Sequence, residues 1–150
     1  EGLCALHSNY YSHEMLGQVP RTGDGYGFHT NGAPLRPLVK THPETNRKSL
    51  YIGRHAYGIP GITEARSEKL LAELLDLAAQ SPRVTDHHWQ PGDLAIWDNR
   101  RVLHRVAPYD YSQPRVMRHT RVAGDPASEL AGTLPDIRAT TYQPGQIALD

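Results

Sequence analysis

The sequence has 150 residues, with 16 Lys and Arg balanced by 16 Asp and Glu, so its formal charge is zero with His neutral. This balance argues against nucleic-acid binding, which usually shows as a basic patch, and no apolar run approaches the roughly 18 residues that a membrane span needs. The hydrophobic residues make up 38%, and with the 13 Gly the share is about 47%, which is typical of a globular domain. A single Cys favours a reducing, cytoplasmic location.

Frequent turn residues shape the first part of the sequence. The 13 Gly and 12 Pro predict short elements joined by many turns, which favours β structure over a helical bundle. Residues 5–11 are predicted to open as a short helix. Residues 17–37 contain so many Gly and Pro that we expect an irregular loop there.

A hairpin and a helix follow. Residues 38–41 and 49–52 are short apolar runs around a turn with Pro and Asn, a pattern that predicts paired strands. A helix is predicted from Thr63 to about Gln80, because Thr63 can cap free N–H groups and apolar residues recur at helical spacing. Its apolar face comprises Ser67, Leu71, Leu74, Leu75 and Ala78, widened by Leu70 and Leu77. The Ser81-Pro82 pair ends the helix.

The next part of the sequence is predicted to be β structure. Side chains alternate over residues 83–89, and a turn with Pro and Gly follows at residues 90–93. Apolar runs then predict strands at residues 94–97, 102–106 and 115–122. Together these elements favour a mainly β domain with one flanking helix.

His104 and Arg115 are the first candidates for a functional site. A His in a strand is more often structural than functional, although imidazole is the commonest metal ligand in proteins. Arg115 follows 11 positions later, and a hairpin would bring the two residues onto adjacent strands. A guanidinium there could hold a carboxylate by two hydrogen bonds. From spacing alone, such a site and a plain strand-edge pair both remain open.

A resemblance favours the functional interpretation. Residues 89–100, with the sequence WQPGDLAIWDNR, then His104, then Arg115-Val116-Met117, closely resemble the TauD/TfdA family of iron(II)- and 2-oxoglutarate-dependent dioxygenases. Residues 37–51 and the helix start at residues 61–64 resemble the family too. The likeness covers about residues 35–124 in the same order.

The resemblance implies a double-stranded β-helix, or jelly-roll, fold that is incomplete in this chain. Residues 35–124 would be its core, preceded by a loop-rich lead-in at residues 1–34 and followed by a tail at residues 125–150. The whole chain would then be the C-terminal part of one dioxygenase domain. Half a jelly roll leaves open sheet edges, so we expect self-association into a homo-oligomer or poor solubility.

The resemblance also implies the roles of individual residues. The family holds Fe(II) by two His and one carboxylate, the facial triad of non-haem iron oxygenases, and His104 takes the place of its distal His. Arg115 takes the place of the Arg that binds the far carboxylate of 2-oxoglutarate, and Trp97 that of an aromatic wall of the metal pocket. His119 stands where relatives that use sulfonates carry an Arg for the substrate anion. No catalytic residue beyond the metal site is predicted.

One departure concerns the other two iron ligands. The family's His-x-Asp/Glu motif has a single match here, His42-Pro43-Glu44, which lies in the family's downstream Thr-His-Pro turn and is interpreted as a decoy. We therefore expect the true motif upstream of Glu1, so that this chain supplies one of three ligands and is inactive alone. The adjacent His87 and His88 point to opposite faces of a strand and are interpreted as structural or solvent-facing. His7, His13, His29 and His55 have no partner at metal-ligand spacing.

These expectations define the competing hypotheses. The first is an oxygenase that uses O2 to couple decarboxylation of 2-oxoglutarate, giving succinate and CO2, to hydroxylation of a small organic substrate, anions included. The alternative is a catalytically inactive fragment or binding module of the same fold. A zinc hydrolase is the weakest hypothesis, because no closely spaced ligand pair such as His-Glu-x-x-His is present.

Overall fold

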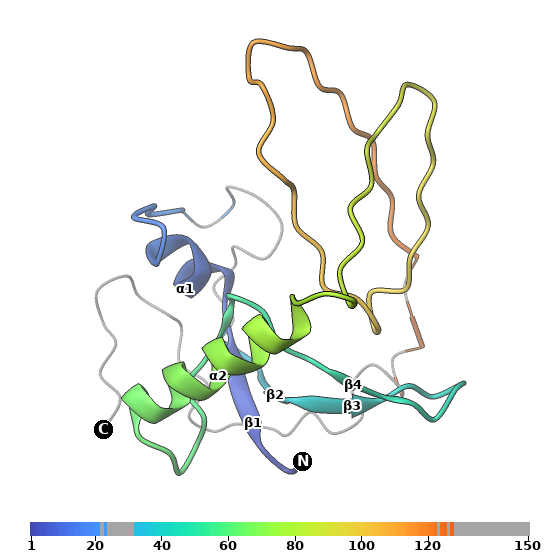
Figure 1. The fold of residues 1–150 in the computed structure, drawn as a ribbon. Helices are drawn as coiled ribbons and strands as arrows, with labels where there is room; N and C mark the ends of the chain where they lie inside the picture. The colour runs from blue at the N-terminus through green and yellow to red at the C-terminus, as the bar shows by residue number, and fades with distance from the viewer. Residues whose placement is uncertain (22, 24–31, 123, 126, 128–150) are drawn as a thin grey trace.

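The computed structural model describes residues 1–21, 23, 32–122, 124–125 and 127 (Figure 1). The elements in these residues are the strands β1 (Cys4–His7), β2 (Leu35–Pro37), β3 (Val39–Thr41), β4 (Lys48–Leu50) and β5 (Ala56–Tyr57) and the helices α1 (Asn9–Glu14) and α2 (Glu64–Ala78). The predicted tail lies almost wholly outside the described residues. Of the described helices, none combines the length and apolar character needed to cross a membrane.

The central strand β1 corrects the prediction of a helix over residues 5–11. β1 pairs antiparallel with β2 on one side and with β5 on the other. Its side chains alternate between half-buried and buried, and Ala5 and His7 are the buried ones. Helix α1 begins only after Ser8, whose Oγ accepts hydrogen bonds from the N–H groups of Tyr10 and Tyr11 at 3.2 and 3.5 Å. The strand forms because two partners flank it.

Strand β2 corrects the expectation of a loop throughout residues 17–37. Its register pairs Leu35 with Leu6 and Pro37 with Cys4 across the sheet. Leu35 is buried, so the apolar contact outweighs the turn signals around it. Pro37 is tolerated because it ends a strand at the edge of the sheet.

The predicted strand pair at residues 38–41 and 49–52 is confirmed. β3 and β4 form an antiparallel hairpin in which Val39 faces Leu50 and Thr41 faces Lys48. The connecting turn is closed by the N–H of His42, which donates to the carbonyl of Arg47 at 2.9 Å.

Helix α2 confirms the predicted helix and most of its apolar face. Leu71 is buried in a core cluster with residues of β1 and β5, and the partly buried residues packed against that cluster include Leu70, Leu74, Leu75 and Ala78. Leu77 differs from the prediction, because half of it remains exposed. Ser67 is 1% exposed, and its Oγ accepts a hydrogen bond from the N–H of Ile59 at 3.2 Å. This bond joins the helix to the segment that follows β5.

Two long arms project from this base (Figure 1). The first arm comprises residues 84–97 and the second arm residues 101–122, and the described backbone of neither contains a strand. The prediction of strands at residues 94–97, 102–106 and 115–122 is therefore wrong for this structure. The predicted turn at residues 90–93 is present, since the N–H of Asp93 donates to the carbonyl of Gln90.

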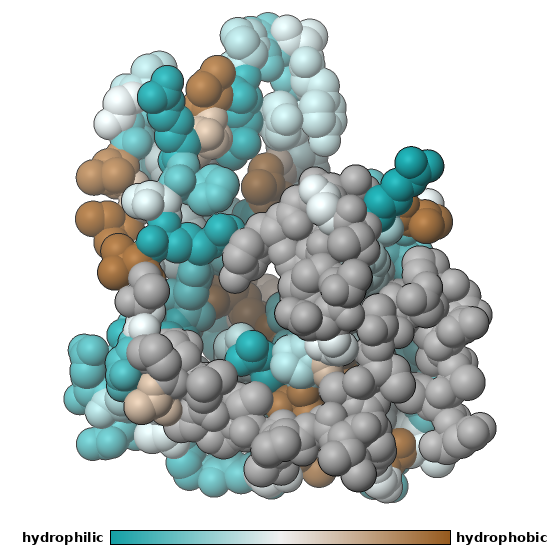
Figure 2. All heavy atoms as spheres, turned by 180° about the vertical axis from the view of Figure 1, so that it is seen from behind, coloured by the Kyte–Doolittle hydropathy of each residue, from teal (hydrophilic) through white to brown (hydrophobic). Residues whose placement is uncertain are grey.

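The arms keep the side-chain pattern of strands without their pairing. Leu94 and Ile96 are 84% and 88% exposed, and Val116 and Val122 are exposed to a similar degree. Figure 2 shows brown, hydrophobic side chains along the projecting arms. A ladder needs a second strand that accepts and donates its hydrogen bonds, and the described residues offer none to either arm. The physical reason for the failed prediction is thus the missing partner.

The Ser67 contact gives a prediction about stability. Ser67→Ala leaves the buried N–H of Ile59 without an acceptor, so we expect it to lower the free energy of unfolding by about 1–3 kcal/mol. Contrary to the expectation from the sequence, the Thr63 side chain makes no capping hydrogen bond, so Thr63→Ala is the matched control at the start of the same helix. Urea denaturation of the full-length protein measures both, and equal losses for the two variants would contradict the assignment.

Candidate functional site

His104 lies near the start of the second arm and contacts the predicted aromatic wall. Its imidazole is tilted by 57° against the indole of Trp97, with ring centroids 5.4 Å apart. The indole N–H donates to Oδ1 of Asn99 at 2.7 Å, which fixes the orientation of Trp97. The structure thus brings Trp97 and His104 together, and both side chains are open to solvent.

Arg115 packs against an aromatic ring of its own arm. The guanidinium of Arg115 lies 5.2 Å from the ring centroid of Tyr109, a cation–π arrangement within the second arm. Among the described residues, no hydrogen bond or ion pair joins His104, Arg115 and His119 to one another. Without a paired hairpin, the roles predicted for Arg115 and His119 remain predictions.

The described residues do not make a metal site by themselves. A facial triad needs three donors around one ion, and the described part of the chain contains no group of three His, Cys, Asp or Glu that could hold a metal. His104 is a single exposed donor. Iron therefore does not fit this chain's described residues on their own, and no reaction step through a metal follows from them.

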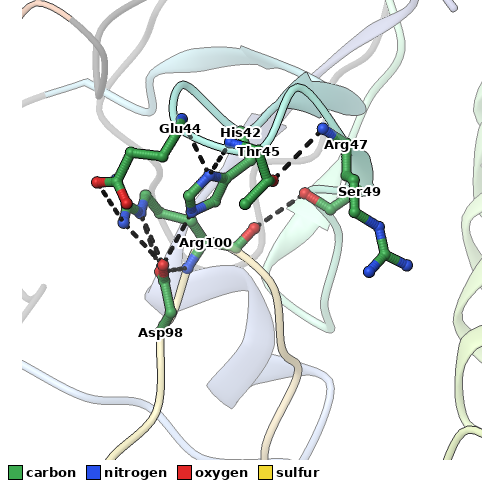
Figure 3. Close-up of polar contacts among 7 residues, drawn as sticks. All are labelled: His42, Glu44, Thr45, Arg47, Ser49, Asp98 and Arg100. Atoms are coloured by element: carbon green, nitrogen blue, oxygen red, sulfur yellow. Dashed lines mark hydrogen bonds and ion pairs between the residues drawn. The ribbon is translucent and has the colours of Figure 1, made fainter.

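The interpretation of His42-Pro43-Glu44 as a decoy agrees with its structure. The His42 side chain is almost fully buried and uses both ring nitrogens within the protein (Figure 3). Its Nε2 lies 3.0 Å from Oδ2 of Asp98, and its Nδ1 accepts hydrogen bonds from the N–H groups of Glu44 and Thr45, each at 3.3 Å. The imidazole is thus committed to contacts that tie the β3–β4 turn to the segment between the arms.

Asp98 and Arg100 complete this contact. The Nε and Nη2 atoms of Arg100 donate to the Asp98 carboxylate at distances of 2.7–3.1 Å, and the N–H of Arg100 donates to Oδ1 of Asp98 at 2.8 Å. The hydrogen bonds from Arg100 and then from His42 hold the pKa of Asp98 well below its usual range. Ser49 in β4 donates its hydroxyl to the carbonyl of Arg100 at 2.9 Å. We name His42, Ser49, Asp98 and Arg100 the arm-base cluster.

The sequence analysis missed the arm-base cluster. The Asp98–Arg100 spacing and the Thr-His-Pro turn were both visible in the sequence, but nothing in either pattern indicates that they meet. Their contact spans 56 positions.

A second group of polar and aromatic side chains lies beside the central sheet. The ring of His7 is 5.2 Å from that of Tyr51 and 4.9 Å from that of His55. Both ring nitrogens of His7 are buried without a hydrogen-bond partner. Burial, followed by the nearby His55 and Arg36, lowers the pKa of His7 to about 3, and burial also lowers the pKa of His55.

Space around His55 is tight. A Cβ placed on Gly53 would lie 2.6 Å from Cε1 of His55, which is closer than any ordinary contact. The sequence offers no partner spacing for either His, and the structure brings the two rings together.

Comparison with known proteins gives similar sequences and structures. Residues 1–122 match the family described as "Taurine catabolism dioxygenase TauD, TfdA family". The chain is 55% identical over 135 residues to the (S)-phenoxypropionate/alpha-ketoglutarate-dioxygenase of Sphingobium herbicidovorans, with 87% of this chain and 47% of that protein covered. It is 42% identical over 127 residues to the alpha-ketoglutarate-dependent 2,4-dichlorophenoxyacetate dioxygenase of Cupriavidus pinatubonensis, with 83% and 43% covered. The chain therefore spans less than half the length of these relatives.

A solved structure supports the fold class. The crystal structure of AAD-2 in complex with Mn(II) and N-oxalylglycine is 40% identical to this chain, with a TM-score of 0.68 over 77% of this chain and 45% of that one. The predicted fold class, an incomplete jelly roll with a flanking helix, is confirmed by this likeness.

The buried His7 gives a prediction about pH. Its pKa of about 3 in the folded protein lies below the ordinary value of 6.5 for His, so between these values the unfolded state binds the proton more readily. Stability at neutral pH is therefore lost as the pH falls from about 6.5 towards 3, by at most about 1.4 kcal/mol per pH unit from this group.

His7→Phe removes the titrating group and is expected to flatten this dependence. Urea denaturation of the full-length protein at pH 7 and pH 5 measures the effect, and His88→Phe at an exposed position of the first arm is the control. We expect the His88 variant to lose as much stability as the unchanged protein, and the His7 variant to lose less. Equal losses in all three proteins would show that His7 does not resist protonation.

Proposed function

The chain belongs to the TauD/TfdA family of dioxygenases, and on this basis we propose that its full-length protein is an Fe(II)- and 2-oxoglutarate-dependent dioxygenase of aryloxyalkanoic acids. The observation that carries the proposal is the family match over residues 1–122, which includes both His104 and Arg115. The relatives named for phenoxypropionate and 2,4-dichlorophenoxyacetate support the substrate class, an aromatic ether with a carboxylate.

In this proposal the chain supplies part of the site. His104 is one of three iron ligands, and we assign the other two to the part of the enzyme that lies outside these 150 residues. An iron ion held in this way would supply the oxygen chemistry, in which 2-oxoglutarate gives succinate and CO2 and the substrate is hydroxylated. Arg115 holds the far carboxylate of 2-oxoglutarate, since its guanidinium can donate two parallel hydrogen bonds. Trp97 would form a wall beside His104, and the contact between their rings supports this role.

His119 is proposed to meet the substrate carboxylate. A His carries only a partial charge at neutral pH, so it would bind a carboxylate more weakly than an Arg does. Such a contact suits a substrate whose aromatic ring contributes most of the binding free energy.

The inactive fragment remains the second candidate for the chain taken alone. The observation in its favour is the lack of a three-donor group among the described residues. The first candidate concerns the full-length protein and the second concerns the 150-residue chain alone. The same measurement made on both therefore tests the two candidates.

Metal binding is the first test of the proposal. Under anaerobic conditions, Fe(II) and 2-oxoglutarate together are expected to give the full-length protein a weak visible charge-transfer band. His104→Ala removes one donor of the facial triad and is expected to abolish this band, whereas His88→Ala at an exposed position keeps it. The 150-residue chain alone is expected to show none. A full-length protein without the band would refute the proposed function.

The co-substrate anchor is tested by a conservative change. Arg115→Lys keeps the charge but loses the planar pair of donors, so we expect the KM for 2-oxoglutarate to rise about tenfold or more. Arg118→Lys is the matched control on the same segment and is expected to leave this KM unchanged. Steady-state kinetics of the full-length enzyme decide, and a similar KM for the two variants would remove Arg115 from the 2-oxoglutarate site.

A further inference from the structure

Five side chains from different strands and strand ends meet beside the central sheet. They are His7 in β1, Arg36 in β2, Lys40 in β3, Tyr51 directly after β4 and His55 directly before β5. The centroid of the Tyr51 ring is 5.2 Å from that of His7, 5.8 Å from Cζ of Arg36 and 5.3 Å from Nζ of Lys40. His55 joins the group through its ring, which lies 4.9 Å from that of His7. We name these five residues the His7 cluster.

Strand register explains why the cluster forms. In the central sheet, Arg36 pairs with the residue two positions before His7, so both side chains lie on the same face. In the β3–β4 hairpin, Lys40 pairs with the residue two positions before Tyr51, and the same argument places these two side chains together. Each pair of strands therefore contributes one cation and one ring to the same place.

His55 is held in position by the backbone around it. Its carbonyl accepts a hydrogen bond from the N–H of Ser8 at 2.8 Å, which fixes the start of β5 to the end of β1. A Cβ on Gly53 would lie 2.6 Å from Cε1 and 2.8 Å from Nδ1 of His55. The glycine therefore makes room for the imidazole at this point.

The cluster has a buried floor and a half-buried rim. His7 is 7% exposed, and both of its ring nitrogens are buried without a hydrogen-bond partner. Arg36, Lys40, Tyr51 and His55 are each half-buried, so they connect the floor to the solvent. Buried polar atoms almost always have a partner. The two nitrogens of His7 therefore indicate a polar group that the described residues do not supply.

The charges of the cluster are all of one sign. The Arg36 and Lys40 cations contact the same Tyr51 ring although like charges repel. Within the described part of the chain, no ion pair joins Arg36 to a carboxylate. The groups whose charge acts on His7 are His55 and Arg36, and the one that acts on His55 is Arg36. An anion would offset this repulsion.

We propose that the His7 cluster binds the carboxylate of a small organic acid between the guanidinium of Arg36 and the imidazole of His7, with Lys40 and His55 at its rim. The two oxygens of a carboxylate match the planar fork of a guanidinium, and a neutral imidazole offers an N–H to the same group. The site needs no metal and does not depend on the proposed function. The competing interpretation is that the cluster is only an aromatic part of the core.

Binding can be followed on the imidazoles themselves, by NMR of the His side chains in the metal-free full-length protein. The probes are acetate, phenoxyacetate and 2-oxoglutarate. We expect the ring signals of His7 and His55 to shift until they saturate, whereas those of His88, exposed in the first arm, stay in place. His7→Phe identifies the signal of His7, because it keeps a ring and removes both nitrogens.

The probes also identify the source of the carboxylate. A dissociation constant that is lowest for phenoxyacetate indicates a substrate, and one that is lowest for 2-oxoglutarate indicates the co-substrate. Similar constants for all three probes indicate that a carboxylate alone is sufficient for binding. Each of these results supports the proposal.

Substitutions of the cations test the geometry. Arg36→Gln is expected to raise the dissociation constant at least about tenfold, because a charged pair of donors is lost. Arg36→Lys keeps the charge without the planar fork, so a smaller increase is expected. Lys40→Gln is expected to raise the constant about threefold, and it carries the test if Arg36→Gln does not fold. Arg101→Gln, exposed in the second arm, is the control and is expected to change nothing.

Four results would overturn the proposal. The first is a His7 signal that none of the three acids moves, and the second is an equal shift with chloride at the same concentration. The third is a dissociation constant that neither Arg36→Gln nor Lys40→Gln changes. The fourth is binding that His119→Gln weakens and Arg36→Gln does not, which would place the carboxylate at the second arm. The iron-dependent visible band tests the proposed function separately.

Discussion

Both ring nitrogens of His42 are engaged at once, and this double contact joins two parts of the chain that are 56 positions apart. One nitrogen closes the turn of a local hairpin, and the other holds the carboxylate that fixes the base of both arms. An imidazole suits this position because it accepts on one side and donates on the other while remaining neutral and buried. The segment between the arms is therefore tied to the hairpin by this contact, while the described arms contain no strand pairing.

Sequence reasoning was accurate where structure is local. α2 follows from apolar residues at helical spacing, and the β3–β4 hairpin follows from two apolar runs around one turn. It failed for β1, which pairs with residues about 30 and 50 positions away. The same limit explains the arms, whose alternating side chains carry the signal of a strand but not the identity of its partner. The side-chain pattern indicates that a segment can form a strand, but which strand it pairs with depends on the rest of the fold.

The candidate site was likewise predictable from the sequence only in part. His104 and Trp97 were found from a resemblance, and the structure places their rings in contact. The arm-base cluster was missed because its members are common residue types that form a site only through their contacts in the folded structure. Spacing alone can also suggest a site that is not there. The His-Pro-Glu triplet has the spacing of metal ligands, but it lies in a turn, and both ring nitrogens of its His are already engaged. Contacts across the chain, rather than motifs along it, distinguish these cases.

The narrow space between Gly53 and His55 has a consequence for mutational libraries of this protein. Any side chain at position 53 must displace the imidazole of His55, whose ring lies 4.9 Å from that of His7. Positions 53 and 55 are therefore epistatic: a larger residue at the first is tolerated only together with a smaller one at the second. A library that randomises position 53 alone would score it as intolerant of larger residues, whereas a paired library would recover the double replacements.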